Sequence, residues 1–187
     1  MKFEPTLIDG AYVLHLEPRG DERGFFARVF CSREFSEVGL VTEFVQFNSS
    51  LSTRAGTLRG MHYQTGASAE TKLVRCIKGA IYDVAIDLRE QSRTFGASFG
   101  VLLNESNRDM FYVPKGCAHG YLTLEASTEV LYFVDNFYDP SIEEGIRFDD
   151  PAFGVSWPLE PIEVSEKDRS WNPFDVTLLR NRKQSES

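Results

Sequence analysis

Cysteine is scarce in this chain of 187 residues, which contains three, too few and too widely spaced for the paired disulfide framework of a small secreted protein. Long apolar runs are missing too, since no stretch approaches the ~20 apolar residues that a membrane-spanning helix needs. The first ten residues carry three charged side chains, so we see no signal peptide. We therefore expect a cytoplasmic protein without membrane contact.

Basic residues are in the minority: 20 lysines and arginines stand against 28 acidic residues, a formal net charge of -8. A general nucleic-acid binder would need a basic surface, so nucleic acid is not an expected partner. The balance still leaves room for a local basic pocket that binds a phosphorylated small molecule.

Histidine is rare as well, with three in the chain. The spacing from Gly56 to His62 resembles the first half of a metal-binding cupin motif, but Gln64 stands where a second histidine would be needed. No further histidine follows before His119, and Lys72 would repel a cation. We therefore expect no metal site.

Strand signals are abundant. The chain is 42% hydrophobic and holds 15 Phe and 7 Tyr, which favours aromatic, strand-rich packing in one domain. Short apolar or alternating runs separated by turn signals are typical of an all-β sandwich or barrel. The expected strands are Tyr12–Glu17, Phe44–Ser49, Leu73–Ile77, Ala80–Leu88, Ser98–Leu103, Asp109–Val113, Gly120–Leu124 and Glu129–Asn136.

Helix signals are few. Ser32 is placed to cap a short helix over Arg33–Val38 that ends at Gly39, and the run Ser165–Asp168 reads as the start of a second helix. We find no repeat and no linker, so residues 1–178 are expected to form a single domain. Residues 179–187 are expected to form a polar, disordered tail.

Five ionisable residues stand out because they lie in stretches typical of strands or tight turns: His62, Lys72, His119, Tyr132 and Asp168. Four of them have an ordinary explanation taken singly. His62 could be a core histidine, Lys72 a solvated edge lysine, Tyr132 a buried tyrosine, and Asp168 the fourth residue of a capping box. Several strands that each contribute one polar group instead indicate a barrel interior used as a reaction chamber.

Six short motifs carry a resemblance that spans nearly the whole chain. They are Gly20–Phe26, Arg59–Gln64, Lys72–Cys76, Pro114–Gly120, Arg147–Pro151 and Ser165–Asp168. In this order they resemble the dTDP-4-dehydrorhamnose 3,5-epimerase family. The resemblance implies a cupin-like jelly roll, a homodimer, no metal or redox cofactor, and a nucleotide-linked 4-keto-6-deoxyhexose as substrate.

The resemblance also implies roles for individual residues. His62 matches the general base, Asp168 its supporting carboxylate, Tyr132 the acid on the opposite face of the sugar, and Lys72 a group at the keto oxygen. The positions that match substrate-binding residues are Arg23, Phe26, Gln46, Asn48, Arg59, His119, Tyr138, Glu143 and Lys167.

The chain departs from the family pattern in three places. Arg28 stands where the family usually has Glu, Phe47 and Ser49 interrupt the usual Gln-Asp-Asn-His motif, and Phe148 replaces a tryptophan. The first two departures bear on which nucleotide and which sugar bind, whereas the catalytic set is intact.

The proposed chemistry explains these residue types. Removing a proton next to a ketone needs a base near neutral pKa and a cation or donor at the keto oxygen, and inversion needs a proton donor on the other face. Histidine with a carboxylate partner, lysine and tyrosine fit these tasks. Three alternatives remain: a single-carbon epimerase acting on a related dTDP- or CDP-4-keto sugar, a non-catalytic cupin sugar-binding module, and a metal-dependent cupin oxygenase or isomerase.

Overall fold

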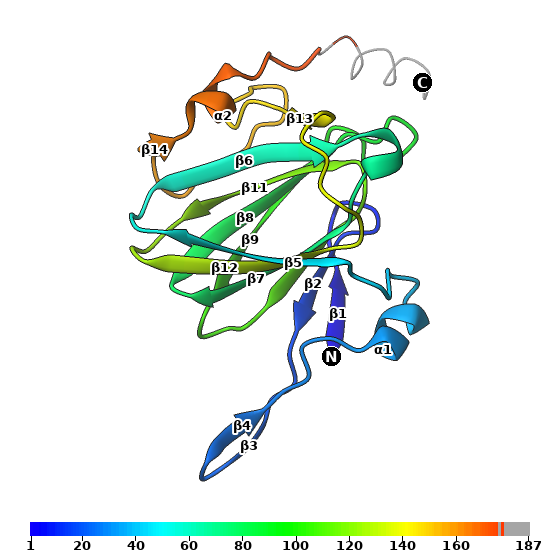
Figure 1. The fold of residues 1–187 in the computed structure, drawn as a ribbon, viewed down its shortest axis with the longest axis vertical. Helices are drawn as coiled ribbons and strands as arrows, with labels where there is room; N and C mark the ends of the chain where they lie inside the picture. Colours follow the sequence, from blue (N-terminus) through cyan, green and yellow to red (C-terminus); the bar gives the residue numbers. More distant parts are fainter. Residues whose placement is uncertain (176, 178–187) are drawn as a thin grey trace.

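Two sheets face each other and enclose the interior of the molecule (Figure 1). The computed structural model describes residues 1–175 and 177. The first sheet has the order β1 (Lys2–Pro5), β2 (Tyr12–His15), β10 (Met110–Val113), β7 (Lys72–Lys78), β12 (Thr128–Val134) and β5 (Gln46–Ser52). The second has the order β13 (Glu143–Gly145), β6 (Thr57–Gln64), β11 (Cys117–Thr123), β8 (Ala80–Asp87) and β9 (Ser98–Asn104), and β14 (Glu163–Val164) pairs with β6. The all-β prediction is confirmed.

The eight strand predictions are confirmed with small shifts of their ends. Six strands were missed: β1, β6, β13, β14 and the two strands of a projecting hairpin. Of these, β6 matters most for the interior. Gly60 interrupts the alternation of β6 and has φ +126. A Cβ at Gly60 would lie 2.5 Å from the Cα of Gly120 on β11. This glycine therefore allows the close approach of two strands.

Strand β8 is covered on both faces, so its alternation of apolar and polar residues does not separate buried from exposed side chains. Ile81 and Ala85 pack between the sheets, while Val84 and Ile86 pack beneath Ile146 and its neighbours. Two aspartates of this strand, at positions 83 and 87, are fully buried. A buried carboxylate is costly without partners. Neighbouring side chains bond both oxygens of Asp87, whereas Asp83 is bonded through Oδ1 alone within the described residues.

Two short helices are present, α1 (Ser32–Glu37) and α2 (Glu166–Ser170). The predicted cap at Ser32 is wrong, because Cys31 is the N-cap and makes no side-chain capping bond. Ser165 does cap α2: its hydroxyl accepts a hydrogen bond from the Asp168 backbone N–H at 3.0 Å. A 3-10 turn spans Gly66–Ser68. The tail predicted for residues 179–187 lies outside the described residues.

A two-stranded hairpin, β3 (Arg19–Asp21) and β4 (Gly24–Phe26), projects away from the two sheets (Figure 1). All six of its strand residues are exposed. Within the described residues, no helix is long and apolar enough to cross a membrane.

Candidate active site

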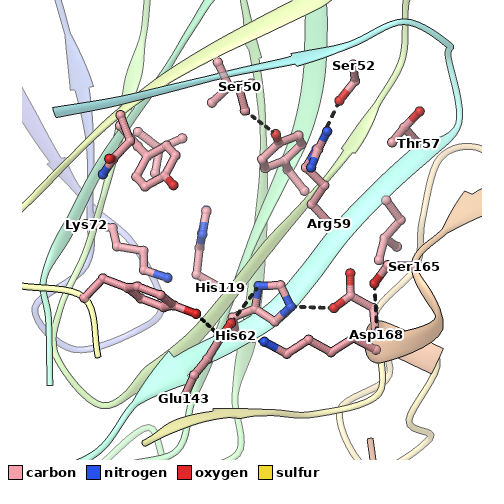
Figure 2. A pocket seen from close by; sticks show the side chains of 18 of the residues that line it. Ser50, Ser52, Thr57, Arg59, His62, Lys72, His119, Glu143, Ser165 and Asp168 are labelled. Carbon is pink, nitrogen blue, oxygen red and sulfur yellow. Dashed lines mark hydrogen bonds and ion pairs between the residues drawn. The ribbon is translucent and has the colours of Figure 1, made fainter. Parts of the chain in front are cut away.

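A cavity of about 870 Å³ opens between the two sheets. It is lined by side chains from β5, β7 and β12 on one side and from β6 and β11 on the other, and α2 closes one end. Figure 2 shows polar groups of both sheets pointing into this space. The barrel interior is therefore polar in part, as the scattered ionisable residues predict.

His62 and Asp168 form a hydrogen-bonded pair in this cavity. Nε2 of His62 lies 2.5 Å from Oδ1 of Asp168, and the Gly60 backbone N–H donates to Oδ2 at 3.4 Å. Burial favours a raised pKa for the Asp168 carboxyl, but hydrogen bonds from His62, Ser165 and Gly60 outweigh it and lower the pKa. Asp168 therefore contributes its backbone to the helix cap and its carboxylate to the histidine.

Glu143 joins three groups at the edge of the cavity. Its Oε2 accepts hydrogen bonds from the Tyr138 hydroxyl and from Nζ of Lys167, both at 2.5 Å, and its Oε1 lies 3.8 Å from Nδ1 of His62. The hydrogen bond to Glu143 raises the pKa of Tyr138 to about 12. The structure thus places a carboxylate on each side of the His62 ring.

Tyr132 and Lys72 come from the sheet opposite His62. Both side chains line the cavity, Tyr132 from β12 and Lys72 from the start of β7. Burial raises the pKa of the Tyr132 hydroxyl, and the negative charge of Glu70 adds to the increase. Tyr132 is therefore protonated at neutral pH, as a proton donor must be.

His119 forms a second histidine–carboxylate pair. Its Nε2 lies 2.7 Å from Oδ1 of Asp83, whose side chain is fully buried. Sequence reasoning missed Asp83; its position on the same face of β8 as Ile81 and Ala85 was the available signal.

The expected binding residues of β5 and β6 also line the cavity. Gln46 and Asn48 sit on the inner side of β5, and Gln46 accepts a hydrogen bond from the Tyr138 backbone N–H at 2.9 Å. Nε of Arg59 donates to the Ser52 hydroxyl at 3.3 Å. Together with Lys167, they give the cavity positive and hydrogen-bonding groups that suit a phosphorylated ligand.

Arg23 and Phe26 are not in this cavity. Both lie on the projecting hairpin, where Arg23 pairs with Asp21 and 71% of Phe26 is exposed. Within one chain, these two expected binding residues therefore lie apart from the other eleven predicted site residues, all of which line the cavity.

Sequence reasoning missed two further residues close to the predicted catalytic set. Trp171 packs edge-on against His62, with ring centroids 6.5 Å apart, and Glu70 contacts Lys72. Neither belongs to a motif that signals chemistry. In residues 1–175 and 177, no group of three or more His, Cys, Asp or Glu side chains is placed to hold a metal ion.

Comparison with known proteins gives a consistent result. A family model described as dTDP-4-dehydrorhamnose 3,5-epimerase matches residues 5–175. A protein of that description from Methanothermobacter thermautotrophicus is 45% identical over 176 residues, which is 92% of this chain and 94% of the relative. A dTDP-4-dehydrorhamnose 3-epimerase from Streptomyces niveus is 32% identical over 170 residues, 90% of this chain and 82% of that protein.

Solved structures agree. The crystal structure of dTDP-4-dehydrorhamnose 3,5-epimerase from Elizabethkingia anophelis aligns with a TM-score of 0.91 at 39% identity and covers 93% of this chain and 96% of that one. The structure of dTDP-6-deoxy-D-glucose-3,5-epimerase from Legionella pneumophila, in complex with dTDP-4-keto-L-rhamnose, aligns with a TM-score of 0.86 at 37% identity and covers 95% and 96% of the two chains. The expected cupin-like jelly roll is confirmed.

Proposed function

Because this chain belongs to the dTDP-4-dehydrorhamnose 3,5-epimerase family and is an epimerase, we propose that it inverts carbons 3 and 5 of dTDP-4-dehydro-6-deoxy-D-glucose to give dTDP-4-dehydro-L-rhamnose. The observation that carries the proposal is the arrangement of the cavity. His62 on β6, paired with Asp168 on helix α2, faces Tyr132 and Lys72 on the other sheet.

His62 is the proposed base. Since the Asp168 carboxylate only accepts hydrogen bonds, Nε2 of His62 carries the proton and Nδ1 is left with its lone pair. Nδ1 then removes the proton next to the ketone, and the two nearby carboxylates, Asp168 and Glu143, stabilise the imidazolium that forms.

Lys72 and Tyr132 complete the proposed cycle. Proton removal places negative charge on the keto oxygen, which the Lys72 ammonium stabilises. Tyr132, from the opposite sheet, then delivers a proton to the other face of the carbon and recovers one from solvent. Because the ketone activates both neighbouring carbons, one site acts at each in turn without a cofactor.

The substrate's nucleotide is proposed to be dTDP, as in the relative solved with dTDP-4-keto-L-rhamnose. Arg59 and Lys167 supply charge for the diphosphate, and Gln46 and Asn48 supply hydrogen bonds. Tyr138, which is 52% exposed at the cavity edge, offers an aromatic face for the base. This remote binding holds the sugar in place for the chemistry.

A homodimer is proposed to complete the site. Arg23 and Phe26 cannot reach the cavity of their own chain, so they bind substrate only if their hairpin enters the cavity of a second copy. The outer side of edge strand β5 supports such an interface, because Phe47 and Leu51 are 68% and 56% exposed there.

Mixing inactive Arg23→Ala and His62→Ala chains should then restore activity, since some mixed dimers hold one intact site. No recovery from stable mixed dimers would contradict the shared site.

The test of the main proposal is incubation with dTDP-4-dehydro-6-deoxy-D-glucose in deuterated water, followed by NMR. Deuterium is expected at both carbons 3 and 5. Incorporation at carbon 3 alone would instead indicate a single-carbon epimerase, the activity named for the Streptomyces niveus relative. Tight binding without exchange would indicate a sugar-binding module. Metal analysis of the purified, active protein tests the alternative of a metal-dependent cupin enzyme.

A further inference from the structure

Glu70 is a buried carboxylate inside the cavity that the proposed cycle does not use. It lies just before β7, lines the cavity, and has a side chain that is 9% exposed. Oε1 forms an ion pair with Nζ of Lys72 at 3.2 Å, and Oε2 accepts a hydrogen bond from the Gln64 amide at 3.1 Å. Each oxygen of the carboxylate is thus directed to a different neighbour.

The segment around Glu70 is fixed on two sides. The Thr71 backbone N–H donates to Asp135 at 2.7 Å, which holds the backbone next to Glu70. Gln64 in turn accepts a hydrogen bond from the Asp139 backbone N–H at 2.8 Å, close to Tyr138 in the chain. A carboxylate held in this way can act as a rigid support for a longer, flexible side chain.

We propose that Glu70 is a positioning residue, which holds the ammonium of Lys72 at the place where the substrate's keto oxygen binds. Its negative charge also acts on the hydroxyl of Tyr132. The inference rests on the proposed function of this cavity. A lysine ammonium is a point charge on a flexible four-carbon stem, so a fixed partner is needed to aim it. Displacement of a catalytic group by about 1 Å is enough to cost roughly 10²-fold in rate.

The second part of the inference concerns Tyr132. Burial raises the pKa of its hydroxyl, and the charge of Glu70 raises it further. An anionic Glu70 therefore favours the protonated form of Tyr132 that a proton donor needs. Removing this charge should lower the pH at which Tyr132 ionises.

The kinetic test compares Glu70→Ala with Glu70→Gln. The alanine variant loses the support and should lose roughly 10²-fold in kcat while KM changes little. The glutamine variant keeps an oxygen for Lys72 and should recover most of the neutral-pH kcat. Its rate should nevertheless fall at a lower pH than that of the wild type on the alkaline side of the profile. Glu160→Gln, an exposed residue outside the cavity, controls for the change in net charge.

A second measurement needs no substrate. NMR of protein labelled with ¹³Cζ-tyrosine, with the Tyr132 signal assigned by Tyr132→Phe, should show an earlier onset of ionisation in Glu70→Gln than in the wild type. An unchanged onset, or wild-type kcat in Glu70→Ala, would overturn the inference. If the wild type itself showed no turnover, the proposed function would fail, and the NMR titration alone would still decide whether Glu70 acts on Tyr132.

Discussion

His62 and His119 lie directly opposite each other on the neighbouring strands β6 and β11, and Nε2 of each ring contacts a different carboxylate. Asp168, the partner of His62, comes from helix α2, whereas Asp83, the partner of His119, comes from the next strand of the same sheet. Two oriented imidazoles therefore share one wall of the cavity. Of these two rings, and within the residues that the structure describes, His62 alone has a second carboxylate, Glu143, near its other nitrogen.

His62→Ala is expected to abolish deuterium exchange at both carbons, because no other base is proposed on that wall. NMR in deuterated water measures this directly. His15→Ala is the matched control, since His15 contacts Glu4 and Asp109 away from the cavity and its loss should leave turnover unchanged. Substantial exchange in folded His62→Ala would reject His62 as the base.

Asp168→Asn should reduce kcat by roughly 10²–10⁴-fold, because the amide no longer fixes the imidazole tautomer. Substrate affinity should change little. Steady-state kinetics and calorimetric binding separate the two effects. Ser165→Ala is the control for the helix cap: it should cost about 1 kcal/mol in stability and leave the His62–Asp168 pair in place. Equal turnover of Asp168→Asn and wild type would show that Asp168 serves only the start of helix α2 and has no role in catalysis.

Tyr132→Phe is expected to separate exchange from inversion. His62 can still remove and return a proton on its own face, so deuterium should enter the substrate while little inverted product forms. NMR of the recovered sugar distinguishes the two outcomes. Tyr12→Phe, on β2, removes a hydroxyl outside the cavity and should behave as wild type. Wild-type yields of inverted product from Tyr132→Phe would show that another group delivers the proton.

Gly145→Ala should disturb the site through packing alone. A Cβ at Gly145 would lie 2.3 Å from Cε2 of Trp171, whose ring packs against His62. The ring must move, so we expect a loss of roughly 1–3 kcal/mol in the free energy of unfolding and a lower kcat. Chemical denaturation measures the first effect. Adding Trp171→Leu should recover part of the stability; if it does not, the contact with Trp171 is not the cause.

Asp87→Asn should destabilise the fold without changing kcat, since Asp87 lies outside the cavity. Burial alone would raise the pKa of the Asp87 carboxyl, but hydrogen bonds from Arg89, Ser92 and Thr94 lower it overall. A carboxyl whose pKa is lowered in the folded state stabilises the protein above its unfolded pKa and loses that contribution as pH falls through the folded value. At neutral pH the variant removes the ionic partner of Arg89, which keeps its hydrogen bond to the Asp9 carbonyl, and should lose roughly 3–5 kcal/mol.

Denaturation of wild type and Asp87→Asn at a series of pH values checks this prediction. The difference in stability should be constant at neutral pH and should shrink as pH falls below about 4. Asp149→Asn is the control, because its exposed pair with Arg147 should contribute at most about 1 kcal/mol. A difference between wild type and Asp87→Asn that stayed constant into acid would contradict the proposed charge interaction.

The sequence by itself determined the all-β class, most strand positions and the cap at Ser165, because these depend on alternation and turn residues that are local in the chain. It did not reveal β6, whose alternation is interrupted at Gly60 for a contact with Gly120. Nor did it place the true N-cap of α1, since capping depends on backbone geometry as well as residue type.

For the site, the motifs identified His62, Lys72, Tyr132 and Asp168, but only the tertiary structure decided how they meet. His62 and Asp168 are 106 residues apart in the chain, and their contact exists because α2 follows β14, which pairs beside β6. The partners Asp83 and Glu70, and the absence of Arg23 from its own chain's cavity, likewise depend on which strands become neighbours. Sheet register and burial are properties of the whole fold, so no local pattern could specify them.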